Sequence, residues 1–163
     1  MRTLLAIALA LFTASGALAR EVVAYDGDLA PGTILVRNAE RHLYLVQEGG
    51  TALRYTVAVG KPGKQWTGEA RIQGKYVRPA WAPPAEIRRD NPRLPKVIPA
   101  GAPNNPMGAR ALVLDRDEYA IHGTNRPDSI GTPASYGCIR MLNEDVIDLY
   151  GRVQVGTRVI VVE

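Results

Sequence analysis

Glycine and proline interrupt this chain so often that little room is left for long helices. The 163 residues include 16 glycines and 12 prolines, and helical periodicity is scarce outside one short stretch near the C-terminus. Both residues mark turns, so the pattern favours many short strands joined by turns. A chain of this length forms one domain and can bury its own core without disulfides or a structural metal. The sequence therefore predicts a mainly β domain.

The N-terminus has the pattern of a secretory signal peptide. Arg2 supplies a short basic start, residues 4–12 are apolar, and small residues end the stretch at Ala17 and Ala19. This pattern predicts cleavage after Ala19 and an exported protein, located in the periplasm or associated with the cell wall. The apolar run is short for crossing a bilayer, so a permanent membrane anchor is the weaker alternative. No cysteine stands near the predicted cleavage site, and no later segment predicts a membrane span.

The charge of the chain is mildly basic and spread along its length. The formal net charge is +4, with one local basic stretch at Arg88, Arg89, Arg93 and Lys96. An exported chain without a platform of interleaved aromatic and basic residues is a poor candidate for binding nucleic acid. For the basic stretch, a solvated loop is favoured over a specific anion site, because charged side chains are usually exposed.

Several segments have strand-like patterns. A turn at residues 48–50 separates two alternating stretches, which predicts a β-hairpin. The hydrophobic patterns predict strands over residues 33–36, 41–47, 52–59, 70–72, 76–78, 111–114, 119–121 and 158–162. One helix is predicted with Asn143 as its N-cap and Gly151 at its left-handed end. His42 is expected at the surface or rim of a strand.

A long proline-rich segment separates the two halves of the chain. Residues 79–107 carry most of the prolines and show only a possible helical turn near residues 85–88. So long a segment without regular structure is either disordered or a functional lid. Its apolar residues favour order: Trp81, Ile87, Leu94, Val97 and Ile98. Whether Trp66 and Trp81 pack inside or face a substrate stays open at this stage.

Cys138 is the only cysteine in the chain. In an exported protein a single cysteine forms no internal disulfide, so it is an inert buried thiol, an intermolecular partner or a reactive group. A thiol becomes nucleophilic when it loses its proton, and a neighbouring imidazole can accept that proton. His122 ends a predicted strand, and one loop leads from it to Cys138. Adjacent strands would then bring the two side chains within hydrogen-bond reach.

The residues around Cys138 fit a nucleophile's surroundings. Gly137 allows the backbone a tight turn, so the amides of Gly137 and Cys138 are candidates to stabilise an oxyanion. Arg140 lies two residues further on, and in an extended segment it projects to the same side as Cys138. Its guanidinium would hold a substrate carboxylate, with a salt bridge to Glu144 or Asp145 as the simpler alternative.

The two motifs together resemble those of the L,D-transpeptidase (YkuD-type) catalytic domain. They are His122-Gly123-Thr124 and, after one loop, Ser135-Tyr136-Gly137-Cys138-Ile139-Arg140. The resemblance extends to Trp81-Ala82-Pro83-Pro84 and Asn105-Pro106-Met107-Gly108, and it covers nearly all of the chain after residue 32. It implies a β-sandwich or barrel of mixed strands, with one or two short helices and residues 79–107 as a lid. Residues 1–19 are then the signal peptide, residues 20–32 an N-terminal lead-in and residues 33–163 the catalytic domain.

The chain departs from the family pattern at two places. Many members have histidine where this chain has Tyr136, so an auxiliary role of that histidine would pass to the tyrosine hydroxyl. Members also often have a Thr-Pro-x-Gly turn where this chain has Gln65-Trp66-Thr67-Gly68. The conformation of that loop is therefore not predicted.

The resemblance implies a peptidoglycan-acting enzyme. Cys138 would attack the bond between the L-centre of a diamino acid and D-alanine in a tetrapeptide stem, and the resulting thioester would pass to an amine. His122 would act as the base and be oriented by the carbonyl of Gly123, while Ser135 and Arg140 would shape the substrate site. No metal or organic cofactor is implied. The acceptor would be another stem or an outer-membrane protein, and the alternatives are an L,D-carboxypeptidase or endopeptidase, or a non-catalytic wall-binding module.

Overall fold

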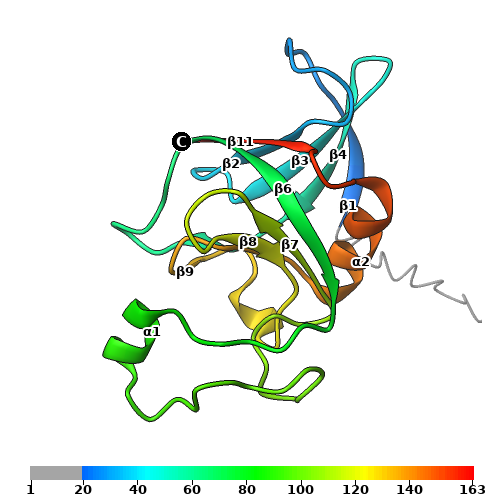
Figure 1. The fold of residues 1–163 in the computed structure, drawn as a ribbon. Coiled ribbons are helices and arrows are strands. Elements are labelled where there is room, and N and C mark those ends of the chain that lie inside the picture. The colour runs from blue at the N-terminus through cyan, green and yellow to red at the C-terminus, as the bar shows by residue number, and fades with distance from the viewer. Residues whose placement is uncertain (1–19) are drawn as a thin grey trace, which may run out of the picture.

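The computed structural model describes residues 20–163, so the predicted signal peptide lies outside the described residues. Nine strands form one sheet in the order β1-β4-β3-β2-β11-β6-β7-β8-β10, and β5 pairs with β9. Figure 1 shows this sheet curving into a half-barrel. The strands are β1 (Arg20–Ala24), β2 (Ile34–Arg37), β3 (His42–Gln47), β4 (Thr51–Thr56), β5 (Val59–Gly60), β6 (Gly68–Val77), β7 (Arg110–Leu114), β8 (Ala120–His122), β9 (Pro133–Ser135), β10 (Ile139–Arg140) and β11 (Arg158–Val162).

The sheet is mixed, and its last strand is bridged to the segment that follows β4. Most neighbours are antiparallel, whereas β2 with β11 and β8 with β10 are parallel pairs. Beyond β4, Ala58 exchanges two backbone hydrogen bonds with Arg140 of the terminal strand β10, at 2.8 and 2.9 Å. The predicted mainly β fold of mixed strands is confirmed, and this bridge joins its first half to its last strand.

Alternation of apolar and polar residues explains how the strands enclose a core. In β2, β3, β4 and β11 the side chains that face inward are nearly inaccessible. The same core includes Ile72 from β6, Leu112 and Leu114 from β7 and Ile121 from β8. The predicted hairpin is present, with β3 and β4 paired from His42 opposite Thr56 to Gln47 opposite Thr51.

One long strand replaces two that the sequence predicted separately. The strands expected at residues 70–72 and 76–78 are parts of the continuous β6. Its first half pairs with β11 and its second half with β7, where the register shifts between Ile72 and Gly74. In the sequence, Gly74 separates two predicted strands. In the structure, the register shift is a β-bulge that keeps Gly74 within one continuous strand.

Two short α-helices accompany the sheet. These are α1 (Ala85–Asp90) and α2 (Asn143–Arg152), and a 3-10 turn, η1, spans Pro127–Ser129. The predicted caps of α2 are wrong. Asn143 is its first residue instead of its N-cap, because its side chain binds neighbouring loops, and the helix continues through Gly151 to Arg152. α2 packs against β7 and β8.

The proline-rich segment is an ordered lid, held at its base by backbone pairing. Trp81 and Ile98 exchange two backbone hydrogen bonds, of 2.9 and 2.8 Å. The side-chain amide of buried Asn105 donates to the carbonyls of Pro79 and Pro99. Of the apolar residues expected to order the segment, Ile98 is fully buried but Val97 is 54% exposed. Order therefore comes from backbone closure as much as from burial.

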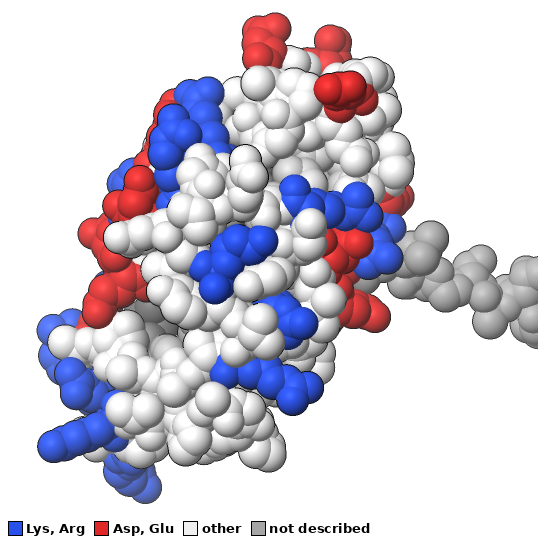
Figure 2. Space-filling view, turned by 45° about the vertical axis from the view of Figure 1, so that its right-hand side comes forward, with Lys and Arg blue, Asp and Glu red and all other residues white. Residues whose placement is uncertain are grey.

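The surface and the N-terminal region add two observations. The lower end of the molecule in Figure 2, which the lid occupies in Figure 1, carries basic but no acidic side chains in that view. Arg88, Arg89, Arg93 and Lys96 are exposed, as a solvated stretch requires. In the predicted lead-in, Arg20–Ala24 form β1 on β4. No helix within residues 20–163 is long and apolar enough to span a membrane.

A buried carboxylate without a partner lies in the first turn of α2. Asp145 is 1% exposed, and neither of its oxygens accepts a hydrogen bond from the described part of the chain. Burial, with the nearby charge of Glu144, raises its pKa from 3.8 to about 6. Asp148, one turn later, binds Arg152 and the Tyr55 hydroxyl, and these contacts hold its pKa below the usual range.

We predict that Asp145→Asn stabilises the protein at pH 8 by on the order of 2 kcal/mol. Because the pKa of Asp145 is higher in the folded than in the unfolded state, its ionisation costs stability as the pH rises from about 4 to about 6. Asparagine removes that cost, so the gain in Tm at pH 8 should disappear below pH 4. Asp148→Asn is the matched control, and it should destabilise at pH 8 because its lowered pKa makes the charged form stabilising. Urea unfolding of both variants at several pH values tests the pair; a gain independent of pH would contradict the prediction.

Candidate active site

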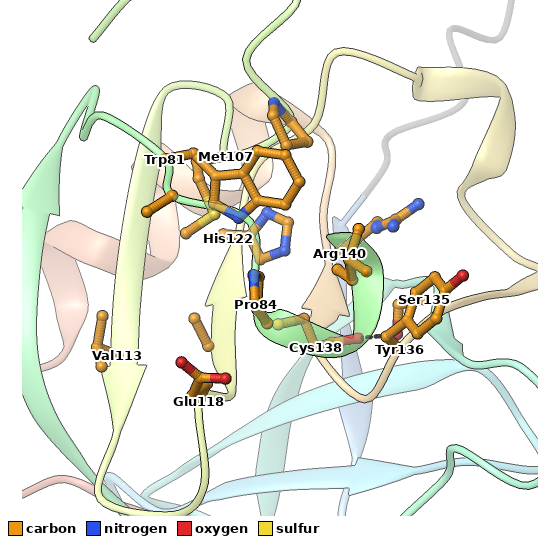
Figure 3. Close-up of a pocket in the computed structure, with 14 residues that line it drawn as sticks. Trp81, Pro84, Met107, Val113, Glu118, His122, Ser135, Tyr136, Cys138 and Arg140 are labelled. Carbon is orange, nitrogen blue, oxygen red and sulfur yellow. Dashed lines mark hydrogen bonds between the residues drawn. The ribbon is translucent and has the colours of Figure 1, made fainter. Parts of the chain in front are cut away.

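Parallel pairing of two short strands brings the predicted site residues to one face. His122 in β8 is in register with Arg140 in β10, and Ile121 with Ile139. Successive side chains of a strand point to opposite faces of the sheet, so Ile121 and Ile139 face the core. His122 and Arg140 therefore lie on the opposite face. Cys138, one residue before β10, lies on the same side as Arg140. Figure 3 shows all three side chains at one pocket.

The lid covers this pocket. It has a volume of about 160 Å³ and is lined by Cys138, His122, Arg140, Ser135 and Tyr136 from below and by Trp81, Pro84, Ile87 and Met107 of the lid. Ligand pockets commonly reach several hundred Å³. In this conformation the cavity is therefore small for a peptide, and binding one requires the lid to move.

His122 is a buried, neutral imidazole with a defined tautomer. It is 3% exposed, and its Nδ1 lies 2.6 Å from the carbonyl oxygen of Gly123. Because a carbonyl only accepts, Nδ1 carries the proton, and the lone pair of the neutral ring lies on Nε2. Burial, together with the charge of Arg140, lowers the pKa of His122 to about 4. The predicted orienting contact to Gly123 is present.

Cys138 is a neutral thiol in the same pocket. Burial raises its pKa, while a hydrogen bond with the Ala120 backbone and the charge of Arg140 oppose that rise. The hydrogen bond between Cys138 and His122 that the sequence analysis expected is absent among residues 20–163. The two side chains line one pocket as an uncharged thiol and an uncharged imidazole, and not as a preformed ion pair. Transfer of the thiol proton to the imidazole creates a thiolate, and it becomes favourable when a substrate carbonyl is present to take up the negative charge.

Arg140 has no carboxylate partner in the described part of the chain. Its Nε is buried without a hydrogen bond, and its burial lowers the pKa of the guanidinium. The salt bridge to Glu144 or Asp145, considered from the sequence, is absent among residues 20–163, since both Asp145 oxygens lack partners and no ion pair of Glu144 is present. Arg140 is thus a half-buried cation that lines the pocket, and no described carboxylate occupies its guanidinium.

Ser135 and Gly137 build the turn that carries the thiol. The Ser135 hydroxyl donates to the carbonyl of Cys138 at 2.5 Å and accepts from the amide of Gly137 at 3.0 Å. The Gly137 amide is therefore occupied in this conformation. It can serve as an oxyanion donor, as the sequence suggested, only if it releases Ser135.

Trp66 supports the turn from beneath. It is buried, its Nε1 donates to the carbonyl of Gly137 at 2.9 Å, and its ring stacks on Tyr119. Gly137 has φ +123°, and a Cβ there would lie 2.3 Å from the Tyr119 ring. Only glycine fits this close approach. Trp66 is thus a packing residue, whereas Trp81 lines the pocket.

Asn143 is a positioning residue that the sequence analysis assigned to another role. Its Oδ1 accepts from the amides of Ala109 and Thr124, and its Nδ2 donates to the Thr124 carbonyl. A Cβ on Gly123 would lie 2.2 Å from that Oδ1. Asn143 therefore fixes the loop just after His122. The only sequence signal was its place in front of a helix, which equally predicts a cap.

Tyr136 fastens the lid instead of pointing to the reacting atoms. Its hydroxyl donates to a carboxylate oxygen of Asp90, the last residue of α1, at 2.7 Å. Lys61 Nζ lies 3.6 Å from the centre of the Tyr136 ring and 4.0 Å from Asp90. A second contact joins Lys64 to Glu86 in the same helix. We call these contacts the lid latch.

The described residues offer no metal site. No group of three or more His, Cys, Asp or Glu side chains within residues 20–163 is arranged to hold a metal ion.

Comparison with known proteins agrees with this fold. Residues 31–161 match the YkuD family of L,D-transpeptidase catalytic domains. The chain is 42% identical over 135 residues to the probable L,D-transpeptidase YbiS of Escherichia coli K12, a match that covers 77% of this chain and 43% of YbiS. An L,D-transpeptidase from Mycobacterium smegmatis has a TM-score of 0.64 at 16% identity, covering 80% of this chain and 58% of that one.

A further solved structure is similar over most of its length. It comes from Brucella melitensis, is described as a probable carnitine operon oxidoreductase, and is 44% identical, with a TM-score of 0.58 over 88% of this chain and 92% of that chain. That description refers to the Brucella protein. The half-barrel fold is that of the L,D-transpeptidases. The chain belongs to the YkuD family of L,D-transpeptidase catalytic domains.

We predict that alkylation of Cys138 by iodoacetamide has a pH midpoint above about 8.5, the ordinary value for a thiol. Burial raises the pKa of Cys138, and Arg140 partly offsets this. Arg140→Gln should therefore move the midpoint higher and slow alkylation several-fold at pH 7.5, whereas Arg140→Lys, which keeps the charge, should change it less. A midpoint below pH 7 would instead indicate a resting thiolate–imidazolium pair.

We also predict that Tyr136→Phe loosens the lid. Loss of the hydrogen bond to the exposed Asp90 carboxylate should raise the population of the open lid about threefold. A bulky maleimide should then label Cys138 faster by a similar factor, while labelling by small iodoacetamide changes less. Tyr44→Phe is the matched control, because that hydroxyl binds Glu40 far from the lid. Equal changes for the two reagents would argue against a latch.

Proposed function

We propose that this protein is a peptidoglycan L,D-transpeptidase that acts outside the cytoplasm, where its predicted signal peptide would deliver it. The observation that carries the proposal is the common face shared by Cys138, His122 and Arg140. Membership of the family supports the reaction class. The chain spans 43% of the length of YbiS, so the substrates and partners of a whole relative are part of the proposal.

In the first step a thioester forms and D-alanine leaves. Arg140 binds a carboxylate of the tetrapeptide stem and orients the carbonyl that follows the L-centre of the diamino acid. His122 Nε2 accepts the thiol proton while Cys138 Sγ attacks that carbonyl carbon. The C–N bond to D-alanine breaks, and the proton passes from His122 to the leaving amine. Backbone amides around Cys138 hold the oxyanion, a role that the Gly137 amide can take by giving up Ser135.

In the second step an amine replaces the thiol. The amine nitrogen bonds to the thioester carbon and gives up a proton to His122 Nε2, the C–S bond breaks, and His122 passes that proton to the sulfur of Cys138. Attack by water in place of the amine would make the enzyme an L,D-carboxypeptidase, which uses the same groups. The acceptor is a second stem or the end of an outer-membrane protein. The closed lid limits the access of water to the partly exposed Cys138, which favours an amine held in the site over hydrolysis.

We expect the chain from residue 20 to convert purified tetrapeptide muropeptides into crosslinked dimers with release of D-alanine. Mass spectrometry of the products measures this, and Cys138→Ala should abolish both products because the nucleophile is gone. His122→Gln should lower the rate by at least about 100-fold, the usual contribution of a general base.

The controls separate the alternatives. Thermal unfolding of Cys138→Ala should match the unmodified protein, so that loss of activity reports chemistry and not folding. Tripeptides without dimers would favour the carboxypeptidase. Unchanged muropeptides together with retained binding to wall sacculi would point to a non-catalytic binding module and would reject the proposed reaction.

A further inference from the structure

The cavity at Cys138 continues into a second lobe. This lobe measures about 300 Å³ and is lined by α1 of the lid and by Glu118 and Tyr119, which precede β8. Cys138 and Glu118 belong to both lobes. In Figure 3, Glu118 and Arg140 lie on opposite sides of Cys138. The thiol therefore lies between a basic side chain, Arg140, and an acidic one, Glu118.

The carboxylate of Glu118 has no basic partner among the described residues. The other two carboxylates of the lobe have basic partners, since Glu86 contacts Lys64 and Asp117 lies 3.7 Å from Arg116. Glu118 forms neither an ion pair nor a side-chain hydrogen bond with any described residue. One exposed negative charge thus faces the junction where the thioester would form.

This charge opposes the first chemical step. Burial raises the pKa of the Cys138 thiol, and the negative charge of Glu118 raises it further, because it disfavours a negative thiolate nearby. A neutral side chain at this position would make the thiolate easier to form. The position of Glu118 is better explained by the later step, when the sulfur is acylated and carries no charge.

We propose that Glu118 selects a cationic amine as the acyl acceptor, by holding the acceptor's ammonium group beside the thioester on Cys138. The inference rests on the proposed function, since only a thioester intermediate needs an acceptor. The held ammonium loses one proton to water and becomes a nucleophile. Its nitrogen then bonds to the thioester carbon, the C–S bond breaks, and the second proton passes through His122 to the sulfur. Glu118 is a specificity residue here and takes no proton.

Two amines of different charge provide the discriminating probe. Free lysine enters as a cation, whereas hydroxylamine is uncharged at neutral pH and still attacks thioesters. In the chain from residue 20, Glu118→Gln should lower kcat/KM for lysine as acceptor about three- to tenfold, mainly through its KM, as expected for one partly screened charge pair. The rate with hydroxylamine should not change. Single-turnover release of D-alanine should be equal or faster, because the thiol ionises more readily.

Asp117→Asn is the matched control, since it removes a neighbouring carboxylate of the same lobe that already has a basic partner. It should leave the preference for lysine over hydroxylamine nearly intact, and added salt should narrow that preference in the unmodified protein. Equal losses for lysine and hydroxylamine in Glu118→Gln would overturn the proposal. Slower D-alanine release would also overturn it, because Glu118 would then act on the donor stem. Failure of the unmodified protein to release D-alanine would count against the proposed function instead.

Discussion

The parallel pairing of β8 with β10 is the constraint on which the rest of the site depends. It sets His122 level with Arg140, and the hydrogen bonds between Ala58 and Arg140 lock β10 to the opposite half of the sheet. Both strands are short, so little of their own hydrogen bonding holds them. The half-barrel supplies the stability, and the turn at Ser135, Gly137 and Trp66 uses that rigid base to present the thiol.

Low solvent access around this pairing determines the charge state of the site. Burial raises the pKa of Cys138 and lowers the pKa of His122, so both groups are neutral at rest. Arg140 is then the main fixed charge near the sulfur, and it faces away from any internal partner within the described chain. The positive charge of Arg140 is therefore in place before a ligand arrives, whereas the Gly137 amide must first release Ser135 before it can stabilise an oxyanion.

Sequence predicted the mainly β fold class, and it placed His122 and Cys138 at one pocket, because the turn residues and the two motifs are local signals. Turn residues and alternation located the hairpin, and the spacing of His122 and Cys138 matched a family pattern. Contacts between distant segments had no such signal. Tyr136 and Asp90 are 46 positions apart and meet only because the lid folds back. Asn143 was misassigned for a related reason: its side chain binds loops that the sequence leaves far away, and this tertiary contact overrides its local preference for a cap. The continuous β6 was missed because Gly74 resembles a break in the sequence, whereas pairing with the distant β7 keeps the strand continuous through a register shift between Ile72 and Gly74.

The neutral resting thiol also fits the compartment that the sequence predicts. A thiolate is the form that oxidants and disulfides attack, so an exposed, ionised cysteine would be short-lived outside the cytoplasm. Here burial and the negative charge of Glu118 keep Cys138 protonated, and the lid limits access to it. In the proposed reaction, the same features would slow the first step until a bound stem brings its carboxylate to Arg140 and its carbonyl to the sulfur. Under this proposal, the neutral charge state that protects the Cys138 thiol from oxidants also makes its reactivity depend on a bound substrate.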